Sequence, residues 1–244
     1  MFHRTKTMKM IQKARIWRSI SLELLNDRFE SLGFEDRIRQ LYRYFDESEI
    51  LFTSSFGTKS AFLLYLISKI RPSQKVHFIN TGFHFPETLA YRDALVKRFK
   101  LKVVEVRPDP IDHKMTEEGT WWKEHSNMCC NWNKVRPLEP IKARHKIWIS
   151  GLMANQTNFR SDLRVFEQQG DIIKFHPIID ISEGDLLYWK SFFKLPSHPL
   201  EALGYDSIGC SHCTTVGRGR EGRWKGKEKT ECGLHPDFFL NRTD

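Results

Sequence analysis

Five cysteines offer most of the chemistry in this chain, and they fall in three places. Cys129 and Cys130 are adjacent, Cys210 and Cys213 form a Cys-x-x-Cys pair, and Cys232 stands alone. Two close pairs supply four soft thiolates, the ligand set of a tetrahedral zinc ion or of an iron–sulfur cluster. Adjacent ligands are unusual in zinc ribbons, which use two spaced pairs. The alternatives are small buried residues at the first pair and a redox dithiol or a zinc knuckle at the second.

Cys232 has the surroundings of a reactive thiol. It is followed by Gly233, Leu234 and His235, and basic residues are dense between positions 218 and 229. Positive charge and a nearby imidazole favour the thiolate, which is the nucleophilic form of cysteine. A lone cysteine near a C-terminus is often incidental, but the glycine, the histidine and the cations favour a nucleophile here.

A loop of small and hydroxyl residues follows the apolar run 50–53 and precedes an apolar helix. Its sequence is Ser54-Ser55-Phe56-Gly57-Thr58-Lys59-Ser60. Small residues let backbone N–H groups approach an anion, and a helix N-terminus adds partial positive charge, so the loop suits a phosphate or sulfate. It is not a Walker motif, because Gly-x-x-x-x-Gly-Lys is absent. An ordinary serine-capped turn is the alternative.

Apolar runs alternate with helical segments through the middle of the chain. We expect β-type runs at 49–53, 76–80, 102–106, 147–150 and 172–179, and helices at 59–70, 87–99, 139–145 and 182–193. This alternation is typical of βαβ units, so we predict an α/β fold with a doubly wound, mostly parallel, Rossmann-like sheet. Ligands in such sheets bind beyond the carboxyl ends of the strands, where the serine loop lies.

We expect three parts along the chain: an N-terminal helical segment (1–46), a nucleotide-binding α/β domain (47–197) and a Cys/Arg-rich C-terminal catalytic tail (198–244). The first part contains two amphipathic helices that cover the domain following them. The second helix carries Phe34, Ile38, Leu41 and Phe45 at helical spacing. The tail is poor in periodicity and rich in Gly, Cys and Arg.

The composition excludes several classes of protein. Hydrophobic residues make up 40% and charged residues 28%, as in ordinary globular proteins. The net charge of +9 suggests an anionic partner, but no nucleic-acid-binding signature accompanies it, so nucleic acid is not the favoured partner. No apolar stretch reaches the ~20 residues of a membrane span, and the basic segment 1–18 lacks the apolar core of a secretory signal. We expect a cytoplasmic protein that binds no membrane.

Several motifs between residues 51 and 235 belong together. They are Ser54-Ser55-Phe56-Gly57, Asn80-Thr81-Gly82, Phe85-Pro86-Glu87-Thr88, Cys129-Cys130 with Lys134-Val135, Ser207-Ile208-Gly209-Cys210, Gly222-Arg223-Trp224 and Glu231-Cys232-Gly233-Leu234-His235. In these the chain resembles the assimilatory sulfonucleotide reductases, specifically the iron–sulfur type acting on adenylyl sulfate. The resemblance implies an adenine-nucleotide alpha-hydrolase-like fold. Members with both cysteine pairs resemble adenylyl-sulfate reductases.

The resemblance also implies roles for individual residues. Cys129, Cys130, Cys210 and Cys213 would ligate a [4Fe-4S] cluster. Cys232 would be the nucleophile, with Lys134, Arg220, Arg223 and His235 around the phosphosulfate. The nucleotide would be bound by Ser54, Ser55, Phe56, Gly57, Thr81, Gly82, Gly151, Gln156 and Arg160. The chain departs from the family pattern at Met153, where an arginine is usual, at Thr157 (serine) and at Asn133 (arginine).

The implied reaction begins with attack of Cys232 on the sulfur of adenylyl sulfate, which expels AMP. Thioredoxin or a similar dithiol would then release sulfite from the cysteine. The main alternative is a reductase of 3′-phosphoadenylyl sulfate, which shares nearly every motif. A more remote alternative is a metal-stabilised nucleic-acid-binding or sensory protein. The sequence leaves a homo-oligomer open.

Overall fold

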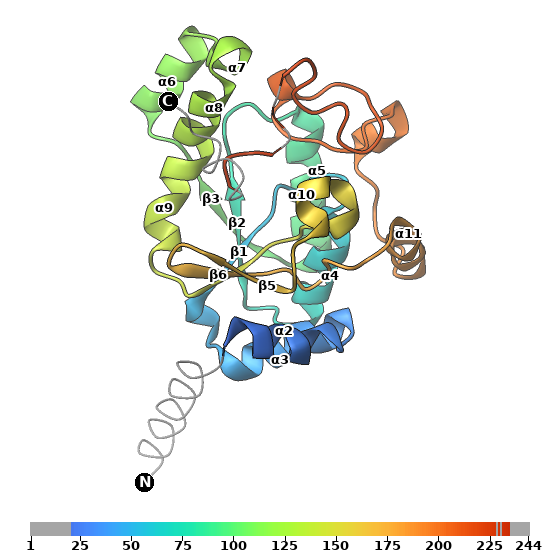
Figure 1. The fold of residues 1–244 in the computed structure, drawn as a ribbon. Helices are drawn as coiled ribbons and strands as arrows, with labels where there is room; N and C mark the ends of the chain where they lie inside the picture. Colours follow the sequence, from blue (N-terminus) through green and yellow to red (C-terminus); the bar gives the residue numbers. More distant parts are fainter. Residues whose placement is uncertain (1–20, 228, 230, 235–244) are drawn as a thin grey trace.

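The computed structural model describes residues 21–227, 229 and 231–234. At its centre is a six-stranded sheet in the order β3-β2-β1-β4-β6-β5, in which β5 alone is antiparallel to its neighbour. The strands are β1 (Ile50–Thr53), β2 (Lys75–Ile79), β3 (Lys102–Val106), β4 (Ile147–Ile149), β5 (Phe166–Gln169) and β6 (Ile172–Phe175). The predicted α/β fold with a mostly parallel sheet is confirmed (Figure 1).

The central strands are apolar on both faces because helices cover both faces of the sheet. On β1, Ile50 and Phe52 join the large core, whereas Leu51 joins a smaller core on the opposite face. β4 repeats this alternation, with Trp148 in the smaller core. Continuous apolar strands of this kind are typical of parallel sheets buried on both sides.

Helices α4 and α5 line the large core, and α9 covers the smaller one through Leu138 and Ile141. The expected helices after β1, β2 and β6 are therefore present, with small shifts at their ends. The α-helices are α2 (Leu22–Glu30), α3 (Phe34–Tyr44), α4 (Ser60–Ile70), α5 (Pro86–Phe99), α6 (Pro110–Glu118), α7 (Trp121–Glu124), α8 (Ser126–Cys130), α9 (Arg136–Lys142), α10 (Asn158–Ser161) and α11 (Glu183–Phe192).

Short helical turns of other types complete the fold. The π-helical turn η2 connects α8 directly to α9, so the segment from α8 to α9 is helical throughout. These turns are η1 (Glu47–Glu49), η2 (Asn131–Val135), η3 (Ala154–Gln156), η4 (Pro199–Leu203) and η5 (Ser211–Cys213). The predicted helix at 139–145 begins earlier, at Arg136, because it continues this helical segment.

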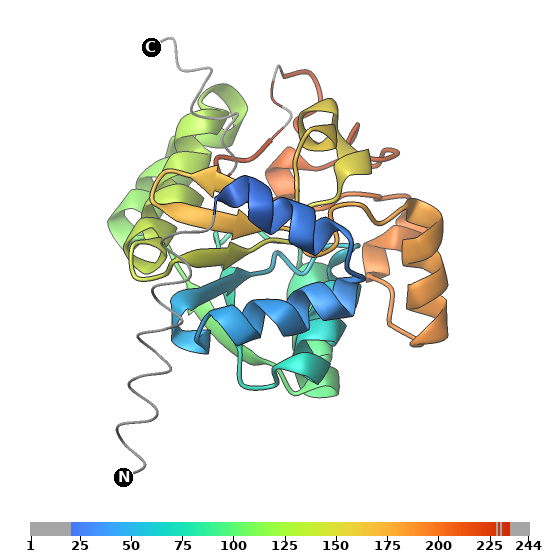
Figure 2. The same cartoon turned by 60° about the horizontal axis from the view of Figure 1, so that its bottom comes forward.

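The two expected N-terminal helices are α2 and α3, and they extend the layer that contains α4. α2 contacts β5, and α3 lies beside α4 (Figure 2). The ring of Phe29 packs edge-on against Phe166 at 4.8 Å between centroids. The helices are thus part of the large core. The domain boundaries at residues 46 and 197 stay a prediction.

A buried arginine fastens these helices to the chain beyond β6. The Arg37 side chain is 1% exposed and donates to both carboxylate oxygens of Asp180, at 2.6 and 2.8 Å. It also donates to the backbone carbonyls of Phe29, Glu30 and Pro177. Without the guanidinium the buried Pro177 carbonyl would lose this donor, whereas the Phe29 carbonyl would keep the N–H of Leu32 at 3.0 Å.

We therefore expect Arg37→Met to lower the free energy of unfolding by about 2 kcal/mol, because the buried Pro177 carbonyl loses its donor and the pair with Asp180 is broken. Arg39→Met, on the same helix, is the control: its pair with Glu35 is half exposed on both sides, so the loss should stay within about 0.5 kcal/mol. Urea unfolding of both variants measures the difference. Equal losses would contradict the assigned role of Arg37.

Candidate active site

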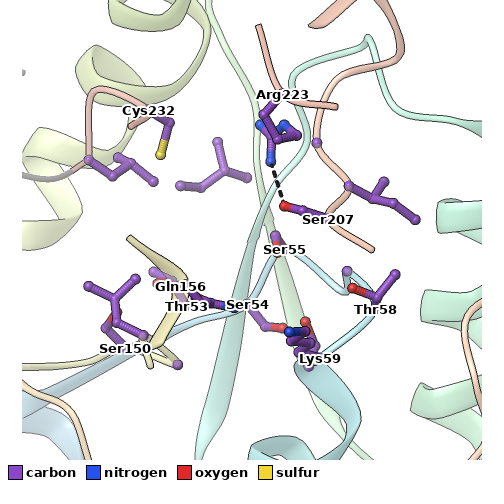
Figure 3. A pocket seen from close by; sticks show the side chains of 18 of the residues that line it. Thr53, Ser54, Ser55, Thr58, Lys59, Ser150, Gln156, Ser207, Arg223 and Cys232 are labelled. Atoms are coloured by element: carbon purple, nitrogen blue, oxygen red, sulfur yellow. Dashed lines mark hydrogen bonds between the residues drawn. The ribbon is translucent and has the colours of Figure 1, made fainter. Parts of the chain in front are cut away.

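The strand order creates a crevice between β1 and β4. The chain leaves β1 towards β2 and β3 and later returns on the other side of β1 as β4, which makes this the switch point where ligands bind in open α/β sheets. A cavity of about 230 Å³ lies at this point. It is lined by the serine loop after β1, the loop after β4 and the C-terminal segment from Asp206 to Leu234 (Figure 3).

The serine loop forms one wall of the cavity. Ser54, Ser55 and Gly57 line it, and the hydroxyl of Ser54 accepts the backbone N–H of Phe56 at 3.2 Å. The backbone of Phe56 is in the left-handed region, with φ 50°, and its fully buried ring packs against Phe78. Non-glycine residues in this region are strained and often lie at functional sites. Phe56 therefore shapes the loop from the core side.

The C-terminal segment is tied to this loop and brings cations over it. The Thr58 hydroxyl donates to the carbonyl of Asp206 at 2.6 Å. Arg223 contacts the Ser207 hydroxyl at 3.5 Å, and a side chain at Gly209 would collide with its guanidinium. Gly209 is thus required for the close approach of Arg223, which lines the cavity beside Lys134 and Arg220.

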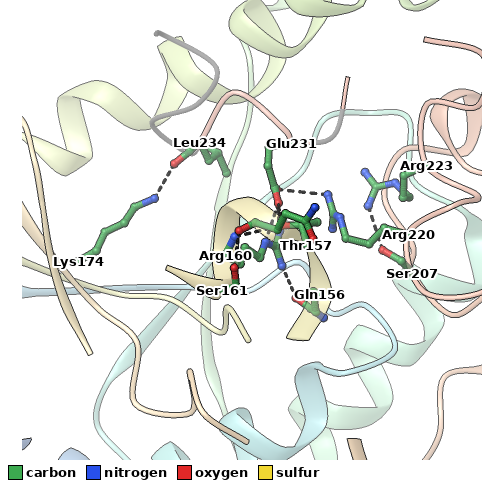
Figure 4. Close-up of polar contacts among 11 residues, drawn as sticks. Gln156, Thr157, Arg160, Ser161, Lys174, Ser207, Arg220, Arg223, Glu231 and Leu234 are labelled. Atoms are coloured by element: carbon green, nitrogen blue, oxygen red, sulfur yellow. Dashed lines mark hydrogen bonds and ion pairs between the residues drawn. The ribbon is translucent and has the colours of Figure 1, made fainter. Parts of the chain in front are cut away.

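Cys232 lies on the far side of the cavity from the serine loop (Figure 3). The thiol is free and half-buried. Its neighbour Glu231 is almost fully buried and accepts two hydrogen bonds from Arg160, both at 2.7 Å (Figure 4). Arg220 approaches the same carboxylate at 3.3 Å. This ion pair connects the segment that carries Cys232 to α10.

The four remaining cysteines converge beside the cavity. Burial, followed by the charges of the other three sulfurs, raises the pKa of Cys129 to about 12. Burial also raises the pKa of Cys213, with Cys210 and Cys130 adding to the effect. The loop after β2 positions the second pair, because Phe83 accepts the N–H of Ser211 at 2.7 Å.

Aromatic and polar side chains enclose these sulfurs. The ring of His212 stacks on Trp122 with centroids 4.0 Å apart. Asn133 donates to the Cys129 carbonyl at 3.0 Å and to Thr116 at 2.8 Å. Lys134 bridges the two regions: burial disfavours its charged form, but the nearby sulfurs of Cys210, Cys130 and Cys232 outweigh this and raise its pKa.

Most of the predicted site residues meet at this cavity. Those that line it are Ser54, Ser55, Gly57, Lys134, Gly151, Gln156, Arg160, Arg220, Arg223 and Cys232. Thr81 and Gly82 lie instead by the cysteine group, where the Thr81 hydroxyl is 3.3 Å from the Cys210 sulfur and Gly82 passes close to the ring of His113. His235 lies outside the described residues. The roles assigned to all these residues stay predictions.

The departures from the family pattern have different positions. Met153 is buried in the large core and is not among the described residues that line the cavity. Thr157 caps α10 by accepting the N–H of Arg160 at 3.3 Å and also contacts Glu231. Asn133 supports the Cys129 backbone as described above. Of the three, Thr157 retains the capping hydroxyl that a serine would supply.

The sequence did not single out Glu231 or Lys174 as site residues. Glu231 was noted only as part of a motif, and its partner Arg160 lies 71 positions away. Lys174, on β6, is almost fully buried and donates to the carbonyl of Leu234 at 2.7 Å (Figure 4). The sequence feature that could have indicated Lys174 is a lysine inside an otherwise apolar strand. Among the described residues, no helix is long and apolar enough to cross a membrane.

The chain matches a known protein family over most of its length. A family model described as the phosphoadenosine phosphosulfate reductase domain matches residues 49–216. The chain belongs to this family. A protein of Bacillus cereus (strain Q1) named adenosine 5′-phosphosulfate reductase is 40% identical over 200 residues, which cover 78% of this chain and 85% of that protein. A protein of the same name from Bacillus mycoides (strain KBAB4) is 38% identical over the same length.

Solved structures agree on the fold. A phosphoadenylyl-sulfate reductase from Candida auris, in a phosphate complex, superposes with a TM-score of 0.70 at 22% identity and covers 81% of this chain and 98% of its own. A Candida glabrata FMN adenylyltransferase superposes with a TM-score of 0.55 at 15% identity, covering 91% of this chain and 83% of its own. These likenesses confirm the predicted fold class.

A buried histidine, His176, leads us to expect that the fold is sensitive to acid. His176 is fully buried, and neither ring nitrogen has a hydrogen-bond partner among the described side chains and backbone. Burial, with the charge of Lys174 adding to it, lowers the pKa of His176 to about 3, and the nearby Ser150 backbone offsets only part of this. As pH falls, the unfolded chain takes up this proton first. The resulting stability is therefore present above about pH 6.5 and is lost towards pH 3.

We expect the wild-type chain to lose about 2–3 kcal/mol of stability between pH 7 and pH 4.5 through His176 alone. His176→Leu should lack this component, whereas His125→Gln, at an exposed position, should retain it. Urea unfolding of the three proteins at both pH values gives the comparison. Parallel acid sensitivity in wild type and His176→Leu would refute the assignment.

Proposed function

We propose that this chain reduces adenylyl sulfate to sulfite and AMP, with Cys232 as the nucleophile. The observation that carries the proposal is a free cysteine facing a serine-rich anion loop across a cavity that Lys134, Arg220 and Arg223 also line. Relatives at 38–40% identity that are named adenosine 5′-phosphosulfate reductases support the same substrate.

The cavity has the chemical character that such a nucleotide requires. Apolar side chains in its lining suit an adenine ring, and they include Leu63, Leu152 and Ile178. The backbone and hydroxyls of Ser54 and Ser55 suit the phosphate, next to the start of α4. The sulfate would then point towards Cys232, where Arg223 and Lys134 balance its charge.

The reaction balances with Cys232 as the nucleophile and an external dithiol as the reductant. The Cys232 thiolate forms a bond to the sulfur of adenylyl sulfate, the bond from that sulfur to the phosphate oxygen breaks, and AMP leaves as an anion. One thiolate of a dithiol reductant then attacks the Cys232 sulfur and releases sulfite, and its second thiol resolves the mixed disulfide. The reductant supplies both electrons. We propose thioredoxin or a similar dithiol in the cytoplasm for this step.

We propose that Cys129, Cys130, Cys210 and Cys213 hold a [4Fe-4S] cluster. The donor set fits, because four sulfurs converge in a largely buried group enclosed by aromatic rings. The described residues contain no ready-made site of three or more His, Cys, Asp or Glu ligands for a single metal ion. A four-iron cluster takes one thiolate at each iron, so its ligands are spread more widely than those of one ion. When bound, the cluster would supply local charge and order beside Lys134.

The presence of both cysteine pairs favours the unphosphorylated nucleotide over 3′-phosphoadenylyl sulfate, and the positive charge of the cavity is already partly offset. Five lysines and arginines among the described residues line the cavity. Three of them are already paired with carboxylates: Lys59 with Glu183, and Arg160 and Arg220 with Glu231. Only two carboxylates make these pairs, so they offset part of the positive charge, and a 3′-phosphate would add about two negative charges to what remains.

A pair of cysteine variants separates the nucleophile from the ligands. Cys232→Ser should keep the full iron content and the absorption near ~400 nm, but lose all activity, since a hydroxyl has a far higher pKa than a thiol. Cys213→Ser, its matched control, should lose both iron and activity. Iron analysis, absorption spectra and sulfite release of anaerobically purified proteins measure this.

A second experiment, on the wild type, identifies the intermediate. Wild type incubated with adenylyl sulfate and no reductant should gain the mass of one SO₃ group on the Cys232 peptide, with equal AMP release. Reduced thioredoxin should then remove the adduct as sulfite. An adduct on Cys210 or Cys213, or an active Cys232→Ser variant, would overturn the assignment.

A further inference from the structure

The segment that carries Cys232 is held at its C-terminal side by β5 and β6. The carbonyl of Leu234 accepts a hydrogen bond from the Lys174 ammonium at 2.7 Å, and the Gln169 amide approaches it at 3.5 Å. The Leu234 side chain packs against the smaller core formed by Leu51, Leu138, Trp148 and Ile172. Both the backbone and the side chain of Leu234 are therefore anchored.

Burial of Lys174 at this contact removes its ammonium group from water, which costs free energy. Lys174 is 2% exposed, and its ammonium lies 4.5 Å from the centre of the Trp148 ring. Burial lowers the pKa of Lys174 to about 7, although Cys232 and Glu231 favour its charged form. A buried lysine is rarely retained for packing alone, because an apolar side chain would avoid the desolvation.

The other side of Cys232 is held by the ion pair already described. Glu231 is fixed by Arg160 from α10, and Leu234 is fixed by Lys174 from β6. Only two residues, Cys232 and Gly233, separate these anchors. Figure 4 shows these two contacts, and together they set the position of the thiol from both sides.

We infer that Lys174 is a positioning residue for the nucleophile, which by holding the Leu234 carbonyl keeps residues 231–234 at the cavity. Lys174 is not among the described residues that line the cavity, so it acts through the segment and not on the substrate. The inference deepens the proposed function and rests on it only for the role of Cys232 in the reaction.

The test measures how readily Cys232 reacts with iodoacetamide, because alkylation reports opening of the segment whatever the enzyme's substrate. Lys174→Met keeps the length and removes the donor, and Leu234→Ala removes the packing at the same anchor. Lys174→Met should speed alkylation of the Cys232 peptide about tenfold, the factor for losing one hydrogen bond to a charged group, and Leu234→Ala should speed it about as much or more because packing against the smaller core is lost. Lys146→Met, at an exposed lysine paired with Glu49, should leave the rate unchanged.

Two further results distinguish positioning from general damage. The iron content and the urea midpoint of Lys174→Met should match those of the wild type, since replacing a buried amine by a thioether removes no packing. In the double variant Lys174→Met/Leu234→Ala, Cys232 should be alkylated at about the rate of the faster single variant. The two effects should not add, because both substitutions release the same anchor. With adenylyl sulfate, kcat of Lys174→Met should fall about tenfold while KM changes less than about twofold.

The outcomes separate this inference from the proposed function. Unchanged alkylation of Cys232 in both single variants would overturn the role of Lys174, whatever the activity. A KM that rises with kcat unaltered would also overturn it, since that pattern belongs to a substrate contact. If wild type releases no sulfite, the proposed function fails, whereas faster alkylation would still establish the anchor.

Discussion

The buried ion pair between Arg160 and Glu231 is the contact on which the arrangement of the site depends. It joins two segments that are 71 positions apart, and both side chains are no more than 5% exposed. Glu231 is adjacent to Cys232, so the pair determines where the thiol lies. Breaking a buried pair leaves an uncompensated charge, which costs about 3–5 kcal/mol. The ion pair therefore stabilises the position of the segment over the cavity.

The same pair reduces the net positive charge that the arginines of the site present to the cavity. Arg160 and Arg220 both face the cavity, but part of their charge is balanced by Glu231. Lys134 is instead surrounded by the sulfurs of the cysteine group and of Cys232. The proposed cluster site and the proposed nucleophile thus share one lysine, which gives a physical reason for their proximity.

Local patterns were enough to predict the five parallel strands of the sheet and the residues at its carboxyl edge. The apolar run at β1 followed by Ser54 to Ser60 located the cavity, because parallel strands deliver their loops to one edge. β5 was missed because its sequence, Phe-Glu-Gln-Gln, is polar at an antiparallel edge. Helices α6 to α8 were also missed, although Asp109 and Pro110 form a recognisable helix start.

Contacts between distant segments were beyond the sequence patterns. Nothing near Glu231 indicates that its carboxylate is buried, since the partner that makes burial tolerable comes from α10. Lys174 likewise acquires its role only when Leu234 reaches the smaller core. Such pairs depend on the tertiary fold, whereas the cysteine spacing and the serine loop are local features.

The most direct test of the central claim compares sulfite release from adenylyl sulfate and from 3′-phosphoadenylyl sulfate, side by side, with reduced thioredoxin. Our account predicts that adenylyl sulfate is turned over. Its kcat/KM should exceed that of 3′-phosphoadenylyl sulfate by about tenfold or more, which corresponds to ~1.4 kcal/mol in transition-state binding. A preference for the 3′-phosphorylated nucleotide would contradict the assigned substrate. Absence of sulfite from both would contradict the proposed reaction itself.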